Sequence, residues 1–292
     1  MDKTRFSVLD QINNSIPTLS QKQRQLAEFI THNYKNAAFM TSTALGNASE
    51  VSESTVVRLA TTLGYSGFPE LQAALQELIQ RELTSIERFS FRDKANRTAV
   101  YANVLSAEAK HMVEVINSIS PKSFDKAVDL LCSQKRVFVV GFQASACLSS
   151  FAGYSLGKVR SGIFPINKWD ESILLQVTDF RPEDVALVYM FPRYPRFTVR
   201  LLKLFRMGNT PVILVTNSSL SPLAPDLSNV VLPVPIRYDG FLDSFAPVFS
   251  FTNALIMATA LKNNERTTQY LEQFETFVKE TEVFESGMRP GE

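Results

Sequence analysis

The stretch EVSESTVVRLATTLGY, residues 50–65, decides how the N-terminal part of this chain folds. Ser52 stands where a helix N-cap is expected, and Gly64 stands where the same helix should end. The preceding stretch TSTALGNASE, residues 41–50, predicts a short helix capped by Thr41 or Ser42. Two short helices joined by a tight turn, the second opening with small polar residues, are typical of a helix-turn-helix.

The residues at the start of the second helix fit contacts with DNA. The N-terminal end of a recognition helix enters the major groove, where hydroxyl groups bond to base edges and arginine bonds to guanine or phosphate. The predicted DNA-binding residues are Ser42, Thr43, Ser52, Glu53, Ser54, Thr55, Arg58 and Tyr65. The alternative is an ordinary helix in which Ser52 is the cap, Glu53 complements the helix dipole and Arg58 is solvated.

The charge of residues 1–70 does not favour DNA binding by itself. Six lysines and arginines balance six aspartates and glutamates, so the net charge of these residues is zero. A neutral DNA-binding domain depends on the placement of its cations, on N–H groups at helix ends, or on dimerisation. We therefore expect a homodimer or homotetramer that binds a palindromic operator. Apolar helices at 244–262 and 268–284 are expected to supply the interface through Phe249, Phe251, Phe274 and Phe277.

Hydrophobic periodicity divides the chain into two domains. Further amphipathic helices at 20–34 and 68–89 make residues 1–89 a helical DNA-binding domain. The polar stretch 90–99 is interpreted as a linker, and residues 100–292 as a second domain that opens with two helices. The predicted strands of that domain alternate with helices and lie at 136–141, 162–167, 184–190, 211–217 and 230–235. The fold class is therefore α/β with an all-α N-terminal domain, the second domain being a doubly wound parallel sheet.

The stretch VSESTVVRLATTLGYSGFPELQ, residues 51–72, resembles the signature of the RpiR/MurR family of bacterial transcriptional regulators. The resemblance implies that a sugar isomerase (SIS) domain, which binds phosphosugars, follows the helix-turn-helix, and the strand pattern after Arg136 has the right place and length. Two positions depart from the family pattern. Gly46 replaces the usual alanine, which lowers helix propensity. Glu50 replaces a common glycine, so we expect it in a left-handed conformation.

The strand ends of the second domain carry the candidate effector site, because ligands of open α/β sheets bind beyond the carboxyl ends of the strands. The predicted effector-binding residues are Gly141, Gln143, Ser145, Arg193, Tyr194, Arg196, Thr198 and Asn217. Asn217 belongs to a run, residues 216–224, that is similar to the family's Thr-x-x-x-x-Ser-Pro-Leu-Ala.

The stretch MFPRYPRFT, residues 190–198, stands where the resemblance implies the phosphate loop Ser-x-Ser-Gly-x-Thr. Its two prolines lack the N–H that an anion nest needs. Arg193 and Arg196 are expected to replace the nest as a clamp for phosphate or carboxylate, with Thr198 capping the following helix and Tyr194 or Phe197 stacking on the ligand. The alternative is a pocket filled by Phe191, Tyr194 and Phe197.

Composition excludes several classes of protein. The chain has 292 residues, a net charge of +1 and no apolar run long enough to span a membrane, so a cytoplasmic protein is expected. With two histidines and two cysteines, no metal site or cofactor is predicted, and Cys132 and Cys147 are expected to be reduced core thiols. We predict a DNA-binding regulator controlled by a small anionic metabolite. The alternatives are a sugar-phosphate isomerase and a regulator with a non-functional pocket.

Overall fold

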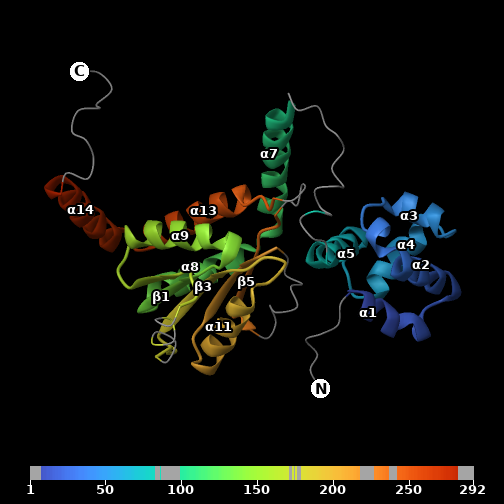
Figure 1. Cartoon of the computed structure of the whole chain (residues 1–292), viewed down its shortest axis with the longest axis horizontal. Coiled ribbons are helices and arrows are strands. Elements are labelled where there is room, and N and C mark those ends of the chain that lie inside the picture. Colours follow the sequence, from blue (N-terminus) through green and yellow to red (C-terminus); the bar gives the residue numbers. More distant parts are fainter. Residues whose placement is uncertain are drawn as a thin grey trace. The chain divides into compact units, whose positions relative to one another are not determined.

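The computed structural model describes residues 8–82, 86, 99–170, 173, 175, 179–217, 227–236 and 242–281. The chain forms two compact units, Met1–Phe91 and Arg92–Glu292, and each is described by itself (Figure 1). The division falls inside the stretch 90–99 that the sequence assigns to a linker. Residues 90–98 of that stretch, like residues 218–224 of the run that follows Asn217, lie outside the described part of the chain.

The N-terminal unit is helical, as predicted. Its elements are α1 (Val8–Ser15), the 3-10 helix η2 (Ile16–Thr18), α2 (Gln21–Ala37), α3 (Ser42–Ala48), α4 (Glu53–Thr62) and α5 (Phe68–Glu82). Ser20 and Gln23 close a capping box at the start of α2, and the side chain of Thr41 caps α3. A single apolar core joins α1, α2, α4 and α5 around the fully buried side chains of Leu26, Ile30 and Leu59. Leu45 of α3 belongs to the same core, which therefore fixes the orientation of α3 relative to α4.

Both departures from the family pattern lie at the turn between α3 and α4. Glu50 has a φ of 54°, which confirms the expected left-handed conformation. A Cβ on Gly46 would lie 2.9 Å from the backbone oxygen of Val51, closer than real Cβ atoms come. The amide of Val51 donates to the carbonyl of Gly46 at 2.9 Å and closes the turn. Gly46 therefore permits the close approach of the turn to α3, in addition to its cost in helix propensity.

The second unit is a parallel sheet with helices on both faces, which confirms the predicted fold class. Its five strands are β1 (Arg136–Val140), β2 (Ile163–Ile166), β3 (Asp184–Tyr189), β4 (Val212–Thr216) and β5 (Val230–Pro233). They pair in the order β2-β1-β3-β4-β5, and every pair is parallel. The helical elements are α7 (Val100–Ser118), α8 (Pro121–Ser133), η4 (Gln143–Ser145), α9 (Ala146–Gly157), α11 (Arg196–Met207), α13 (Ala246–Lys262) and α14 (Asn264–Glu280).

Alternate residues of the strands enter two different cores. Val137 and Val139 face the core that is covered by α8, α9 and α13. Phe138 and Val140 face the core that is covered by α11 (Figure 1). Burial of both faces explains why the strands are continuously apolar, since neither face meets water.

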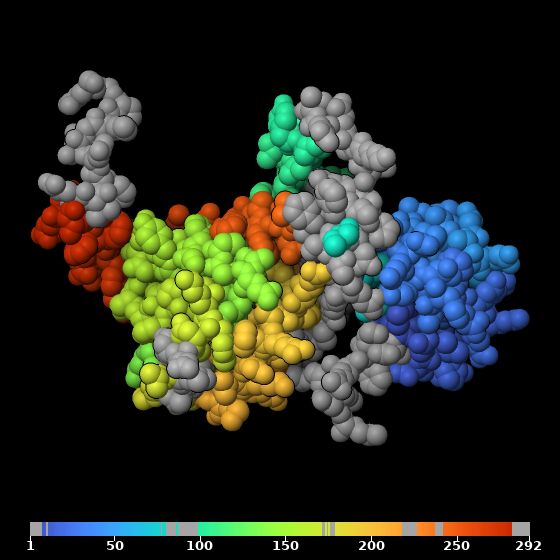
Figure 2. All heavy atoms as spheres, viewed as in Figure 1, coloured from blue at the N-terminus to red at the C-terminus, as the bar shows by residue number. Residues whose placement is uncertain are grey.

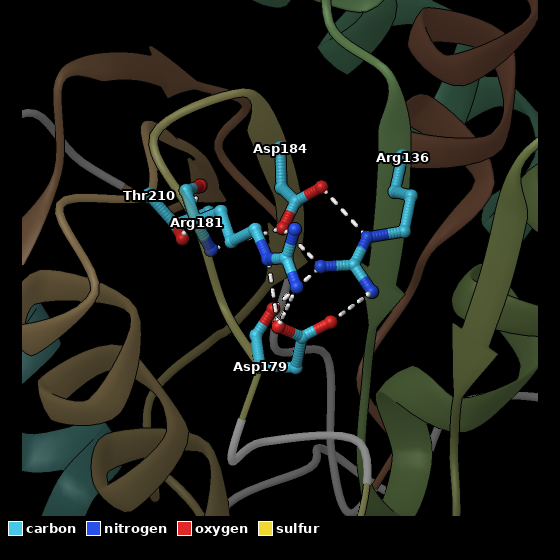
Figure 3. A network of polar contacts seen from close by, with 5 residues as sticks. All are labelled: Arg136, Asp179, Arg181, Asp184 and Thr210. Atoms are coloured by element: carbon cyan, nitrogen blue, oxygen red, sulfur yellow. Dashed lines mark hydrogen bonds and ion pairs between the residues drawn. The ribbon is translucent and has the colours of Figure 1, made fainter.

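The amino ends of β1 and β3 are joined by a polar network (Figure 3). Asp184, which is 2% exposed, accepts from Nε of Arg136 at 2.8 Å and from its Nη2 at 2.7 Å. The same carboxylate accepts from the backbone N–H of Arg181 at 3.0 Å. Asp179 bonds to both arginines, and the hydroxyl of Thr210 donates to the carbonyl of Arg181 at 2.8 Å. The hydrogen bond that Arg136 donates to Asp184 is the main cause that raises the pKa of the Arg136 guanidinium.

Several apolar side chains of the second unit remain exposed. The first turns of α7 stand out from the body of this unit (Figures 1 and 2), and Tyr101 and Leu105 on them are 73% and 65% exposed. On α14, Phe277, one of the predicted interface residues, is 62% exposed. Phe251, in contrast, is buried in the core. Among the described residues, no helix is long and apolar enough to cross a membrane.

Two of the other predicted interface residues pack within the unit. Phe249 contacts the ring of Phe151 at 5.2 Å between centroids, and Phe274 lies under the ammonium group of Lys158 at 5.0 Å. Exposed apolar side chains therefore lie on α7, which the sequence analysis did not name, and also on the two predicted helices, at Met257 and Leu261 of α13 and Leu271 of α14.

Candidate DNA interface and effector pocket

The helix-turn-helix presents a compact polar surface around the start of α4. Thr43, Ser52, Glu53, Ser54 and Arg58 are all exposed, as the predicted role requires. Ser42 is half-buried and donates to a carboxylate oxygen of Glu53 at 2.6 Å, which ties the first turn of α3 to the first turn of α4. The Ser52 hydroxyl lies 2.9 Å from that of Ser54.

Two of the predicted DNA-binding residues lie in the core instead. Thr55 is 7% exposed, and its hydroxyl lies 2.9 Å from that of Ser52. Tyr65 is 9% exposed, and its hydroxyl donates to the side chain of Gln11 at 3.0 Å. The prediction for these two residues requires correction, because α4 buries the side chain of Thr55 and the bend after Gly64 brings Tyr65 back onto α1.

Arg58 is held on the exposed face of α4. Its Nε donates to the carbonyl of Ser54 at 3.1 Å, and its Nη2 donates to the hydroxyl of Ser54 at 3.2 Å. These contacts restrict the rotamers of a long side chain, so less entropy is lost when the guanidinium meets a base or a phosphate. The arrangement can present one cation and several hydroxyl groups to the major groove.

The second unit contains a pocket of about 730 Å³ at the carboxyl ends of its strands. Its lining residues follow β1, β2 and β3 and continue into the first turn of α11: Phe142, Gln143, Asn167, Lys168, Trp169, Arg193, Tyr194, Pro195, Arg196, Phe197 and Arg200. In a sheet of order 2-1-3-4-5 the helices change faces between β1 and β3, and ligands bind at this point. The pocket brings together four of the predicted effector residues, namely Gln143, Arg193, Tyr194 and Arg196.

The lining of the pocket is positively charged and aromatic. Lys168, Arg193, Arg196 and Arg200 line it together, and the described lining residues include no carboxylate. Phe197 stacks on Trp169 with centroids 4.5 Å apart and planes inclined by 15°. Such a surface favours an anion that also carries an apolar or planar part.

Two residues of the pocket have strained backbones. Gln143 has a φ of 54° and Arg193 a φ of 68°, in the left-handed region that non-glycine residues rarely adopt. The strand end before Gln143 is held by Gly141, where a Cβ would come within 2.3 Å of the carbonyl oxygen of Ser145. Strain of this kind costs roughly 1–3 kcal/mol per residue and persists mainly at functional sites.

Four predicted effector residues, namely Gly141, Ser145, Thr198 and Asn217, do not line the pocket. Ser145 is 6% exposed at the end of η4. Thr198 lies inside α11, fully buried, and does not cap the helix, because Pro195 occupies the N-cap position. Asn217 accepts from the backbone N–H of Ile236 at 2.8 Å and so joins the end of β4 to the segment after β5. These residues support the strand ends, and their predicted ligand contacts require correction.

Of the three aromatic residues that could have filled the pocket, Tyr194 and Phe197 line it, whereas Phe191 lies elsewhere. Phe191 is buried in the core on the opposite face, where its ring lies 5.2 Å from that of Phe245. The residues after β2, Lys168 and Trp169, were missed by the sequence reasoning, which considered the ends of β1, β3 and β4. The signal was present, because INKWD, residues 166–170, follows a strand next to the switch point.

Neither cysteine belongs to the pocket. Cys147 is exposed, contrary to the expectation of a core thiol, and its Sγ donates to the carbonyl of Ala144 at 3.0 Å. Cys132 is half-buried, and burial raises the pKa of its thiol. Among the described residues there is no cluster of histidine, cysteine, aspartate or glutamate that could hold a metal ion.

Comparisons with known proteins find similarity to the helix-turn-helix unit and to the parallel-sheet unit. Residues 6–82 match the helix-turn-helix domain of the rpiR family. The chain is 25% identical over 262 residues to the HTH-type transcriptional regulator HexR of Pseudomonas aeruginosa, covering 87% of this chain and 86% of that protein. It is 22% identical over 281 residues to HexR of Escherichia coli, covering 94% and 96% of the two chains.

Two solved structures share the fold. The sugar isomerase domain of the RpiR transcription factor from Sphaerobacter thermophilus has a TM-score of 0.58 and 24% identity, over 61% of this chain and 99% of that one. The Vibrio vulnificus NanR protein, solved in complex with ManNAc-6P, has a TM-score of 0.56 and 19% identity, over 95% of this chain and all of that one (100%).

Proposed function

We propose that this chain, which belongs through residues 6–82 to the RpiR family of helix-turn-helix proteins, is a transcriptional regulator controlled by a small anionic metabolite. The observation that carries the proposal is the pocket at the strand switch point, where four cationic side chains meet on a strained backbone. A regulator needs a sensor as well as a DNA-binding domain, and this pocket has the position and the chemistry of a sensor.

The DNA contacts are proposed for the exposed residues around the start of α4. Ser52, Glu53, Ser54 and Arg58 would face the major groove, with Thr43 and Ser42 on the adjoining end of α3. Replacing Arg58 by alanine should weaken operator binding by roughly 1–3 kcal/mol if the guanidinium contacts a base. A regulator of this kind acts where the DNA is, so we also propose a cytoplasmic location.

The effector is proposed to be a phosphorylated sugar or a carboxylate. Arg193 and Arg196 would form charge-assisted hydrogen bonds to the anion, Lys168 and Arg200 would add to the positive field, and the ring of Phe197 would contact the carbon skeleton. The complex of NanR with ManNAc-6P supports a sugar phosphate in a protein of the same fold.

A homodimer is proposed as the form that binds DNA. Exposed apolar residues on α7 and α14, such as Leu105 and Phe277, would be covered by a second copy. Two copies related by a two-fold axis would present two α4 helices to a palindromic operator, which would compensate for the neutral charge of each DNA-binding domain.

The rival function is a sugar-phosphate isomerase. Moving a proton between sugar carbons usually requires a carboxylate or an imidazole as general base. The described lining residues offer neither, and the two HexR relatives bear the names of regulators. We therefore propose that the chain is not an enzyme.

The single tryptophan gives a direct test, because Trp169 lines the pocket. The full-length protein would be titrated with phosphorylated sugars and with carboxylates, following both Trp169 fluorescence and heat. The same titrations would be made with Arg193→Ala/Arg196→Ala and with Lys203→Ala, an exposed cation on α11 that does not line the pocket. Each charge-assisted contact is worth about 1.5–3 kcal/mol, so the double variant should lose tenfold or more in affinity and the control should lose nothing.

The second half of the test concerns DNA. A ligand found in this way should change the affinity of the parent protein for its operator, and should not change that of the double variant. If the ligand binds but the affinity for the operator does not change, the chain is a regulator with a non-functional pocket. If the ligand is converted to an isomer, the sugar-phosphate isomerase is the better assignment.

A further inference from the structure

One exposed residue of α4 has no polar role. Val57 is 42% exposed, whereas its neighbour Val56 is fully buried in the core of the unit. The other exposed side chains of α4 are polar or charged, so Val57 is the one apolar exposed side chain of this helix. It neither extends the core nor adds charge or hydrogen bonds to the surface.

The position of Val57 places it beside the proposed base contacts. Residues three and four apart on a helix are neighbours, so Val57 lies between Glu53 and Thr61 and next to the row formed by Ser54 and Arg58. The guanidinium of Arg58 is drawn towards Ser54, which lies one turn nearer the amino end. Val57 is therefore exposed beside Ser54 and Arg58, on the surface that is proposed to meet the DNA.

The major groove contains one kind of apolar group, the C5-methyl of thymine. A valine side chain has a strongly preferred rotamer in a helix, so it can hold its methyl groups against a base at little cost in entropy. A serine or threonine hydroxyl can bond to several base edges, but an apolar side chain gains most from a methyl group. The apolar side chain of Val57 thus favours thymine, whereas the hydroxyl groups of its neighbours can bond to several different bases.

We propose that Val57 is a specificity-determining residue that recognises the C5-methyl group of a thymine within the operator half-site, adjacent to the base pair that Arg58 contacts. The proposal rests on the proposed DNA-binding function. A contact between Val57 and this methyl group would give a preference for thymine, which the net charge and the hydroxyl groups of the interface do not supply.

The test removes a single methyl group from the DNA. An operator would first be selected by the full-length protein from a pool of random duplexes. Each thymine of the selected duplex would then be replaced, one position at a time, by deoxyuridine, which differs only by the C5-methyl. At one thymine in each half-site, the replacement should lower the affinity of the parent about fourfold. One buried methyl group contributes ~0.8 kcal/mol, and ~1.4 kcal/mol corresponds to a tenfold change in affinity.

Two variants complete a cycle with this replacement. Val57→Ala should lose a similar factor on the thymine duplex and should show no further loss on the deoxyuridine duplex. Arg58→Ala should bind more weakly but retain the fourfold ratio between the two duplexes. Both positions are exposed, and melting of each variant at the parent temperature would show that the unit is folded.

The other possible results of this test contradict either the inference about Val57 or the proposed function. A deoxyuridine penalty that persists in Val57→Ala comes from DNA shape or from another residue and overturns the inference. The inference is equally wrong if the half-site contains no thymine, or if no replacement changes the affinity by more than about twofold, well below the one-methyl effect. Failure of the parent to select any sequence would instead overturn the proposed function.

Discussion

Replacement of Asp184 by alanine should destabilise the sheet unit strongly while leaving its pocket intact. Asp184 accepts two hydrogen bonds from Arg136 and one from the backbone of Arg181, and it is 2% exposed. Its loss removes the charge that faces a guanidinium between two central strands. Removing one partner of a buried ion pair costs ~3–5 kcal/mol.

The expected cost lies below this range. The side chain of Arg136 is 30% exposed and keeps its contacts with Asp179, so the remaining charge is partly compensated by water and by the second carboxylate. We therefore expect Asp184→Ala to lower the free energy of unfolding by about 2–3 kcal/mol. Asp184→Asn, which keeps the volume and one acceptor, should lose roughly half as much.

The control variant is Asp179→Ala. Asp179 contacts the same two arginines but has a side chain that is 48% exposed, so its loss should have little effect. Urea unfolding followed by the fluorescence of Trp169 reports the sheet unit alone, since the helical unit contains no tryptophan. The reasoning would be refuted if Asp184→Ala and Asp179→Ala unfolded at the same urea concentration with the same slope. Ligand binding should be unchanged in both, because the network lies at the amino ends of the strands and the pocket at their carboxyl ends.

Two substitutions and one labelling experiment test the strained and reactive positions. Glu50→Gly should stabilise the helical unit by about 1 kcal/mol, because the φ of 54° suits glycine, and thermal unfolding by circular dichroism would detect this. Gln143→Gly should stabilise the sheet unit by a similar ~1 kcal/mol and weaken the binding of the anionic effector, and equal affinity in calorimetry would show that Gln143 makes no ligand contact. In thiol labelling at neutral pH, Cys147 should react faster than Cys132, because Cys147 is exposed whereas Cys132 is half-buried and burial raises the pKa of its thiol, which lowers the fraction of reactive thiolate. Equal labelling rates would contradict the burial of Cys132.

The fold class followed from local patterns. Apolar strands that alternate with helices after Arg136 have no polar face, so they require cover on both sides, and a parallel sheet satisfies this. The helix-turn-helix was equally readable, because Ser52 and Gly64 mark the ends of α4 through backbone conformations that depend on a few neighbouring residues. The left-handed conformation of Glu50 was predicted from the resemblance, because glycine is common at this position in the family.

The site depended on contacts between segments that are distant in the sequence. Gln143, Lys168 and Arg193 follow three different strands, and only the strand order β2-β1-β3 brings their loops to one pocket. The stack of Phe197 on Trp169 and the burial of Phe191 on the other face depend on the direction in which each side chain leaves its strand or helix. Local periodicity distinguishes a buried position from an exposed one. The arginines of the proposed clamp were predicted from their place at a strand end where the family resemblance implies a phosphate loop. Periodicity does not specify which buried or exposed groups meet, and for that reason Thr55, Tyr65, Thr198 and Asn217 had to be placed by the tertiary structure.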